Sequence, residues 1–436
     1  MHLRVSVLLL WFAVAASAQD AAPLKLTLRD AVAMALRQNP QVILANLDVA
    51  QSEQERNLAR SGLMPQLTGR ASETANRVNL EAAIGFKFPG FAQHVGPYWV
   101  NQGGVGYNVP VFDLTLWRRY RGSQIGIEST RAQERNIREE SVLLVVSQYL
   151  GSQRAAADVQ AAQSRVDLAQ ALYDQAADLQ KNGAGTGIDT LRANVQLQNE
   201  KQRLIVAQTQ SETSLFGLAR LLSLDPQTKI ELADQVRFFD TPEVSAGQTL
   251  ERAFQARPEL RQIQSQEQQA AIELRSAGEE RLPKISATGF WAEQGATGSN
   301  AIPVYQYQFN LDVPLFTGGR IEANRSKAEI AARQLKQQEQ ELRNRIALEV
   351  KTALAQLASA RNEVTVARLG VQLAQQEVTQ ARDRFQAGVA NNIEVVTAQD
   401  ELARANDNQI GALYRYNQSR ADLARAVGQM ETLYAQ

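Results

Sequence analysis

The 436-residue chain contains no cysteine, which excludes disulfide bridges, thiol catalysis and cysteine-ligated metals. It has two histidines, and only His94 lies beyond the first 18 residues, so no histidine pair or HExxH zinc motif can form. Aromatic residues make up 6% of the chain, and the 46 basic residues balance the 46 acidic ones. We therefore expect no nucleic-acid partner, no metal, no cofactor and no enzyme activity.

Phosphate-binding and nucleophile motifs are missing as well. The glycine-rich turn Gly183-Ala184-Gly185-Thr186-Gly187 lacks the Lys-Ser/Thr pair that would make it a phosphate loop. Acidic residues are frequent, but no pair of carboxylates is singled out, and acids on long helices usually form a solvated face. Nothing in these patterns predicts catalysis.

Long apolar runs are scarce. One extends from Val5 to Ala16, follows a single basic residue, Arg4, and ends in the small-residue site Ala16-Ser17-Ala18. This order predicts a secretory signal peptide at residues 1–18. The run is shorter than the roughly 20 apolar residues that span a bilayer as a helix. The remaining sequence has no comparable run, so we expect no transmembrane helix.

The rest of the chain reads as two copies of one pattern. Prolines and a glycine recur in the same order: Pro40 with Pro258, Pro65 with Pro283, Pro110 with Pro314, and Gly183 with Gly388. The spacing is 218 for the first pair (258 − 40) and 204 for the third (314 − 110). The second repeat is thus shorter by 14 residues (218 − 204) between these anchors, and such length changes belong in surface loops.

We expect a first repeat at 19–222, a linker at 223–247 with helix-breaking prolines, and a second repeat at 248–436. Each repeat is predicted to contain a helix, a β-hairpin, a long helix and a return helix. The predicted elements of the first repeat are a helix kinked at Pro40, a hairpin at about 66–109, and helices at about 115–182 and 188–222. Those of the second are a hairpin at about 284–313 and helices at about 320–387 and 392–430.

The clearest strand signal lies near residue 309. Apolar side chains alternate there with polar ones; the apolar positions are Tyr305, Tyr307, Phe309, Leu311 and Val313, and the polar ones are Gln306, Gln308, Asn310 and Asp312. Strands of about ten residues with this alternation can cross a membrane obliquely, and aromatic residues on the apolar face suit a lipid-facing band. The alternative is a soluble sheet that packs the same face onto a core.

After Pro314 the apolar period becomes seven. Two interleaved series recur at every seventh residue: Val350, Leu357, Val364, Val371, Val378 and Phe385, and Ala353, Ala360, Ala367, Ala374 and Ala381. The first repeat carries matching positions that include Val145, Val159 and Val166 with Ala155, Ala162 and Ala169. This pattern predicts a coiled-coil seam in which alanine lets the partner helix approach closely. A helix over 320–387 would be roughly 100 Å long.

These motifs together resemble the TolC-like outer-membrane efflux proteins. The resemblance rests on Leu26-Thr27-Leu28 followed by Ala-x-x-x-Ala-Leu-x-x-Asn39-Pro40, and on Val-Pro-Val-Phe and Val-Pro-Leu-Phe-x-Gly-Gly-Arg after the strands. It also rests on Phe385-x-x-Gly388 with Ile393-Glu394-Val395-Val396-x-Ala398-Gln399. The similarity covers nearly all of the mature chain, and the order of the motifs is specific.

The resemblance implies an α+β membrane protein of the outer membrane. Each protomer of a homotrimer would give four strands to a twelve-stranded transmembrane β-barrel in contact with outer-membrane lipid. Long antiparallel coiled-coil helices would continue the barrel as a periplasmic tunnel. The implied function is a passive exit duct of a tripartite efflux or type I secretion system. The implied partners are a periplasmic adaptor and an inner-membrane pump.

The resemblance also suggests functional residues at the turns. Glu394 matches one acidic gate position of the family, and Asp189 is its counterpart in the first repeat. The family's next acidic position, one helical turn later, is occupied here by Thr397. Either acid also suits a first helical turn. The turns are candidates for adaptor docking, through Gly183, Gly185, Gly187, Gln386, Gly388, Val389 and Asn391.

The rival interpretations are a periplasmic coiled-coil adaptor, a soluble periplasmic scaffold and an enzyme. Adaptors resemble one hairpin inserted into compact β domains, whereas this sequence has two hairpins in tandem and strands of the 305–313 kind. The enzyme is disfavoured by the missing site. The sequence does not identify the exported substrate.

Overall fold

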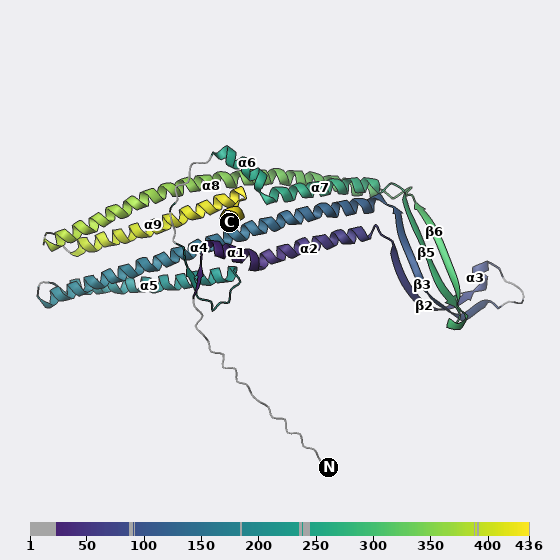
Figure 1. Cartoon of the computed structure of the whole chain (residues 1–436), viewed down its shortest axis with the longest axis horizontal. Coiled ribbons are helices and arrows are strands. Elements are labelled where there is room, and N and C mark those ends of the chain that lie inside the picture. The colour runs from purple at the N-terminus through teal and green to yellow at the C-terminus, as the bar shows by residue number, and fades with distance from the viewer. Residues whose placement is uncertain are drawn as a thin grey trace, which may run out of the picture.

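The computed structural model describes residues 23–435, except 87–89, 91, 184, 235–237, 239–244, 388, 390 and 391. The predicted signal peptide, much of the second half of the predicted linker, and the candidate residues Gly388 and Asn391 lie outside the described residues. The molecule is elongated, with a four-stranded sheet at one end and two long helical hairpins that reach the other end (Figure 1).

The sheet is antiparallel, in the order β2-β3-β5-β6. Its strands are β2 (Gln66–Asn79), β3 (His94–Phe112), β5 (Lys284–Gly295) and β6 (Ile302–Asp312). The two predicted hairpins therefore join through β3 and β5. At 19 residues β3 is longer than predicted, and it continues through Pro110 past the expected end at 109. The register shifts between Pro110 and Phe112. This irregularity accommodates Pro110, which has no backbone N–H to donate to the neighbouring strand.

The two hairpins differ in the connections at their far ends. The first contains α3 (Leu80–Ile84) and then a loop to His94, whereas β5 and β6 are joined across a single 3-10 turn, η1 (Gly298–Asn300). Most of the extra length of the first repeat lies in this connection, where the sequence predicted a surface loop.

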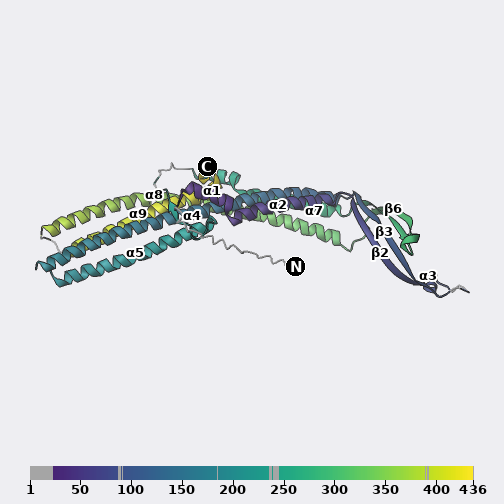
Figure 2. The same cartoon turned by 60° about the horizontal axis from the view of Figure 1, so that its bottom comes forward.

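The helical half is a layer of four long helices. They are α4 (Leu114–Lys181), α5 (Gly187–Leu221), α8 (Arg320–Gln386) and α9 (Asn392–Val427). Contacts between them give the order α5-α4-α9-α8, which Figure 2 shows as four neighbouring rods. The predicted return helix to about 430 is too long, because Gly428 adopts a left-handed φ of 75° and ends α9.

Shorter helices run between the sheet and the middle of the molecule. They are α1 (Leu28–Gln38), α2 (Pro40–Ser61), α6 (Ala246–Ala256) and α7 (Pro258–Glu279). The prediction of one helix kinked at Pro40 is wrong. Asn39 is extended and its side chain accepts the Gln41 N–H at 2.9 Å, so a new helix starts there. Pro40 occupies the first position of α2, where a missing N–H costs nothing.

A compact core forms at the middle of the molecule, where β1 (Leu24–Leu26) pairs in parallel with β4 (Ile230–Leu232). The Tyr149 hydroxyl of α4 donates to the Leu26 carbonyl at 2.9 Å and is buried in the same apolar cluster. The terminal helix α10 (Met430–Tyr434) begins on Glu139 of α4, whose carboxylate accepts the Met430 N–H at 2.7 Å. The middle segment thus joins β1 and α10, the first and last elements that the structure describes, to α4.

The predicted heptad seams are confirmed. In the second hairpin, Ala360 and Val364 of α8 pack against Ala412 and Tyr416 of α9. Nearer the turn, Val378 and Ala381 face Val395 and Ala398. In the first hairpin, Val166 and Ala169 of α4 pack against Leu197 of α5. Alanine at alternate layers keeps the paired helices close, as expected for knobs-into-holes packing.

Candidate functional site: a two-faced sheet and two helical turns

One face of the sheet presents aromatic and aliphatic side chains. On β6 Tyr305, Tyr307, Phe309 and Leu311 are 65–81% exposed, and Val313 just beyond the strand is 45% exposed. The register continues this face across the sheet, because Tyr305 lies opposite Trp291, and Trp291 opposite Val105. Large apolar side chains so exposed on one contiguous face indicate a surface that meets an apolar environment.

The opposite face is polar and hollowed. Gln306 donates to Gln308 at 3.2 Å, Gln308 donates in turn to Asn310, and Asn310 donates to the Thr288 hydroxyl at 3.1 Å. A concave region of about 530 Å³ opens on this side, and its polar lining includes Thr68, Ser72 and Gln102 as well. The alternation predicted for β6 thus separates two different surfaces of the whole sheet.

Two glycines allow the strands to pack closely, and the sequence pattern did not reveal their role. A Cβ on Gly289 would lie 2.7 Å from the Tyr107 hydroxyl, because the Tyr107 ring covers this position. Tyr107 then meets Tyr307 with ring centroids 6.3 Å apart. A Cβ on Gly104 would lie 2.4 Å from the Ala292 Cβ. A larger residue at Gly104 would force β3 and β5 apart, and one at Gly289 would meet the Gln306 carbonyl of β6 as well as Tyr107.

The helical turns lie together at the end of the molecule opposite the sheet (Figure 1). In the first turn Gly183 adopts φ 73°, and a Cβ on Gly185 would meet the Leu179 side chain at 3.0 Å. Gly187 is the first residue of α5. In the second turn Gln386 ends α8, and Val389 is 68% exposed.

The two candidate gate acids occupy equivalent first turns. The Thr186 hydroxyl donates to the Asp189 carboxylate within the start of α5. Glu394 of α9 forms an ion pair with Arg384 of α8, with Nε and Oε1 2.9 Å apart. Asp189 also lines a cavity of about 220 Å³ with Ile393, so the starts of α5 and α9 border the same space. The sequence pattern does not single out Arg384. Its position ten residues before Glu394 (394 − 384) nevertheless suits an ion pair between the two helices that flank the turn.

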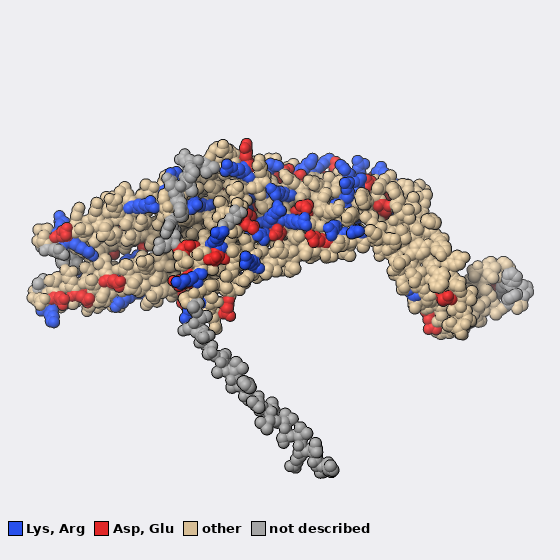
Figure 3. Space-filling view, viewed as in Figure 1, with Lys and Arg blue, Asp and Glu red and all other residues tan. Residues whose placement is uncertain are grey.

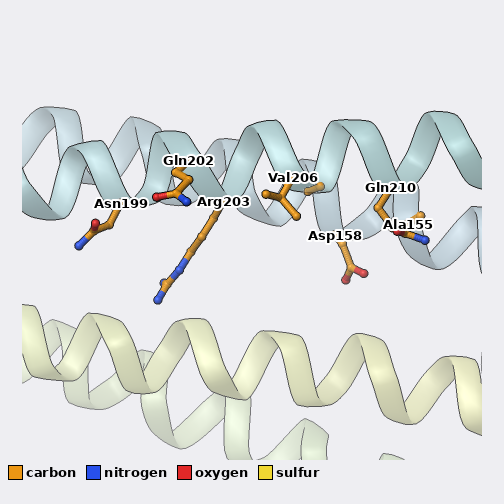
Figure 4. A pocket seen from close by; sticks show the side chains of 8 residues that line it. Ala155, Asp158, Asn199, Gln202, Arg203, Val206 and Gln210 are labelled. Atoms are coloured by element: carbon orange, nitrogen blue, oxygen red, sulfur yellow. The ribbon is translucent and has the colours of Figure 1, made fainter.

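A second ionic cluster lies farther along the helices. Arg165 of α4 pairs with Asp407 of α9 at 2.9 Å and with the buried Glu200 of α5 at 3.3 Å. Beside it, a hollow of about 520 Å³ is lined by α4 and α5, and Figure 4 shows Arg203 and Asp158 pointing from them toward α9. Burial raises the pKa of Asp158, and the neighbouring Asp407 raises it further against the effect of Arg154. This cluster links the two hairpins within one chain.

The described residues contain no group of three or more His, Cys, Asp or Glu side chains that could hold a metal ion. Within the same part of the chain, every helix is too short or too polar to cross a membrane.

A sheet with one apolar and one polar face, joined to long helical hairpins, defines the class of outer-membrane channels with a helical extension. The fold matches the solved Campylobacter jejuni CmeC outer membrane channel with a TM-score of 0.81 and 18% identity, over 92% of this chain and 85% of CmeC. The chain belongs to the outer membrane efflux protein family, whose sequence profile matches residues 31–223 and 249–429.

Two curated relatives come from Pseudomonas aeruginosa. The alkaline protease secretion protein AprF is 23% identical over 411 residues, which cover 90% of this chain and 82% of AprF. The pyoverdine export outer membrane protein OpmQ is 24% identical over 258 residues, or 56% of this chain, and the match spans about half of OpmQ (52%). The protein is therefore an outer-membrane exit duct, and the adaptor and scaffold interpretations are set aside.

Proposed function

We propose that three copies of this chain close their sheets into one twelve-stranded barrel, continued by their helices as a periplasmic tunnel. The observation that carries the proposal is the four-stranded sheet itself, with its exposed apolar face and polar concave face. Its edge strands β2 and β6 each have one side without a partner strand in the described part of the chain. Lipid does not tolerate such open edges, so pairing between copies is required.

The helices support the same assembly. The edges of the helical layer are α5 and α8, and the edges of the sheet-proximal layer are α2 and α8. Both edges expose apolar residues: Leu191, Val195 and Ile205 on α5, Leu44 and Leu47 on α2, and Val366, Leu369 and Leu373 on α8. One side of the protomer, with β2, α2 and α5, can thus pair with the other side, with β6 and α8, of the next copy. Such a head-to-tail contact closes into a ring.

Native mass spectrometry of the detergent-extracted protein tests the assembly. We expect one oligomer of three chains, and release of single chains by Leu191→Asp or Leu369→Asp, because each buries a charge in the contact between copies. Val389→Asp is the matched control at an exposed turn and should leave the oligomer intact. A native protein that is extracted as a single chain would contradict the proposal.

We further propose that the turns dock a periplasmic adaptor, which delivers substrate from an inner-membrane pump into the passive duct. Support comes from their place at one rim, opposite the strands (Figure 1), and from the exposure of Val389. Cysteines at Gln386 and Val389 of this cysteine-free chain should crosslink to the adaptor. Val389→Asp should lower export at normal oligomer yield. Full export without a crosslink from either turn would place the docking surface elsewhere.

The gate proposal concerns Asp189 and Glu394, which would narrow the periplasmic end of the tunnel. Replacing both by alanine should change leak or cation block in planar-bilayer recordings. Arg384→Ala separates the gate from a structural role, because it breaks the ion pair and leaves the Glu394 charge in place. Opposite shifts in cation block from Glu394→Ala and Arg384→Ala would support the gate. Equal effects of the two substitutions on cation block would indicate that Glu394 acts only through its ion pair with Arg384, which joins α8 and α9.

AprF is named for alkaline protease secretion and OpmQ for pyoverdine export. These two cargoes differ greatly in size and chemistry, so the proposal covers the duct and no particular substrate.

A further inference from the structure

The middle of the hollow face of the sheet carries a single charge. Rows of cross-strand neighbours run over this face, from the row that joins Gln66 and Gln308 to the row that joins Ser72 and Ile302. These rows hold neutral polar residues, glycines and a few apolar residues, together with Arg70. Lys284 and Asp312 also face this side, at the strand ends next to the helices, and the Lys284 ammonium pairs with the Asp113 carboxylate of the helix cap at 3.0 Å. Arg70 is thus the one charge in the middle of this face, within the described residues.

The surroundings of Arg70 leave its guanidinium accessible. Its cross-strand neighbour on β3 is Gly104, which has no side chain and has no room for one against Ala292. The nearest acids on the strands, Glu73 and Glu293, have the opposite strand parity and point to the apolar side. Arg70 is exposed and forms no ion pair with any residue that the structure describes. Hydroxyl and amide groups of Thr68, Ser72 and Gln306 line the same hollow.

We propose that Arg70 is a selectivity-determining residue that makes the barrel section of the duct favour anionic substrates. The inference rests on the proposed function, in which the hollow face is the lumen and each copy contributes one Arg70 to a ring. Guanidinium groups bind carboxylate, phosphate and sulfonate groups through paired N–H donors, and neighbouring amides and hydroxyls add weaker hydrogen bonds. Charge of one sign in a confined passage raises the local concentration of ions of the opposite sign.

The test is the reversal potential of the native oligomer in a planar bilayer under a potassium chloride gradient. Arg70→Gln should lower the chloride-to-potassium permeability ratio about threefold, the change that a local potential of about half a kT produces because it favours the anion and disfavours the cation together. Arg70→Lys retains the charge and should keep the native ratio. Glu73→Gln is the matched control, because it removes a charge three residues away on the opposite face. Native mass spectrometry of each variant confirms that the compared oligomers are the same.

The possible failures are distinguishable. A conducting native protein whose permeability ratio is the same in Arg70→Gln would overturn the selectivity role and leave the duct standing. A shift of the same size and opposite sign in Glu73→Gln would also overturn it, since position in the hollow would then be irrelevant. An oligomer that does not conduct even when Asp189 and Glu394 are both replaced by alanine would overturn the proposed barrel lumen, and the inference with it.

Discussion

The sheet and the helices of this protein distribute apolar residues in opposite ways. Along α8 the apolar series is buried, with Val350 and Val364 at 0% exposure, and the outer surface is strongly charged (Figure 3). Along β6 the apolar series is exposed, with Phe309 at 81%, and the polar series lines a hollow. The helices thus bury their apolar series between them, whereas the sheet exposes its apolar series on one face and places polar groups on the other.

The difference teaches that the two regions depend on different partners. Each helical hairpin closes its seam within one chain, and the outer edges of α5 and α8 expose apolar residues that another copy could cover. The sheet has no layer packed on either face in the described residues, and its edges are open. In the proposed assembly the sheet gains its stability from lipid and from other copies.

The largest expected effect is on the helical side. Ile346 is fully buried in the cluster of α8 with Leu260 of α7. Ile346→Ala should lower the free energy of unfolding by about 2–5 kcal/mol, through lost burial and the cavity that remains. Lys351→Ala on the exposed side of the same helix should change it by less than about 0.5 kcal/mol. Thermal unfolding followed by circular dichroism measures both, and equal effects would contradict a helix core closed within the chain.

In the sheet, unlike in the helices, a substitution at an exposed apolar side chain should be the damaging one. Phe309→Arg, at the most exposed aromatic position of the sheet, should destabilise the membrane-inserted protein by roughly 2–4 kcal/mol if it lies near the bilayer midplane. Gln308→Arg, one residue away on the hollow face, should be tolerated. The fraction that remains folded in lipid vesicles at increasing urea concentration provides the measurement. Similar tolerance at the two positions would refute the lipid-facing assignment.

The seam can be probed by adding volume. Ala374 is 7% exposed between α8 and α9, so Ala374→Leu should overpack the contact at a cost of roughly 1–3 kcal/mol. Ala367 is half-buried against the cluster of Ala360 and Tyr416, and a similar cost is expected for leucine there. Gln375→Leu, off the seam, is expected to be nearly silent in thermal unfolding. Identical unfolding temperatures for the Ala374 and Gln375 variants would argue against knobs-into-holes packing.

The smallest effect is expected where the two regions join. Arg118 of α4 hydrogen-bonds Glu279 at the end of α7 at 2.6 Å, and this contact lowers the pKa of Glu279 below 4.5 despite some burial. The stabilisation is therefore present above pH of about 4.5 and is lost as pH falls through the lowered pKa. Glu279→Gln should cost about 1 kcal/mol at neutral pH.

The pH dependence supplies the control for this prediction. Below the lowered pKa of Glu279 the native protein and Glu279→Gln should be equally stable, because the native carboxyl is then neutral too. Urea unfolding of both proteins across the acidic range measures the difference. A difference that persists at the most acidic pH would show that the glutamine changes packing and not charge.

The sequence by itself determined the periodic features of the molecule. The period of two at Tyr305–Val313, the period of seven after Pro314, and the recurring prolines and glycines are local patterns. Each shows in the sequence alone which segment is a strand, which face of a helix packs in a seam, and where a helix ends. The long helices therefore begin and end close to the predicted residues. The sequence predicts a kink at Pro40 where the structure has the end of one helix and the start of another, because the capping geometry of Asn39 has no periodic signal.

Only the tertiary structure decided which distant segments meet. The pairing of β3 with β5 joins residues such as Val105 and Trp291, and the ion pairs Arg165–Asp407 and Arg384–Glu394 connect separate helices. Likewise, the isolation of Arg70 in the hollow depends on Gly104 across the strand pair. Charged and glycine positions lie off the apolar stripes, so no period marks their partners. Their environment is set by the register between elements that fold separately, and that register is a property of the packed chain.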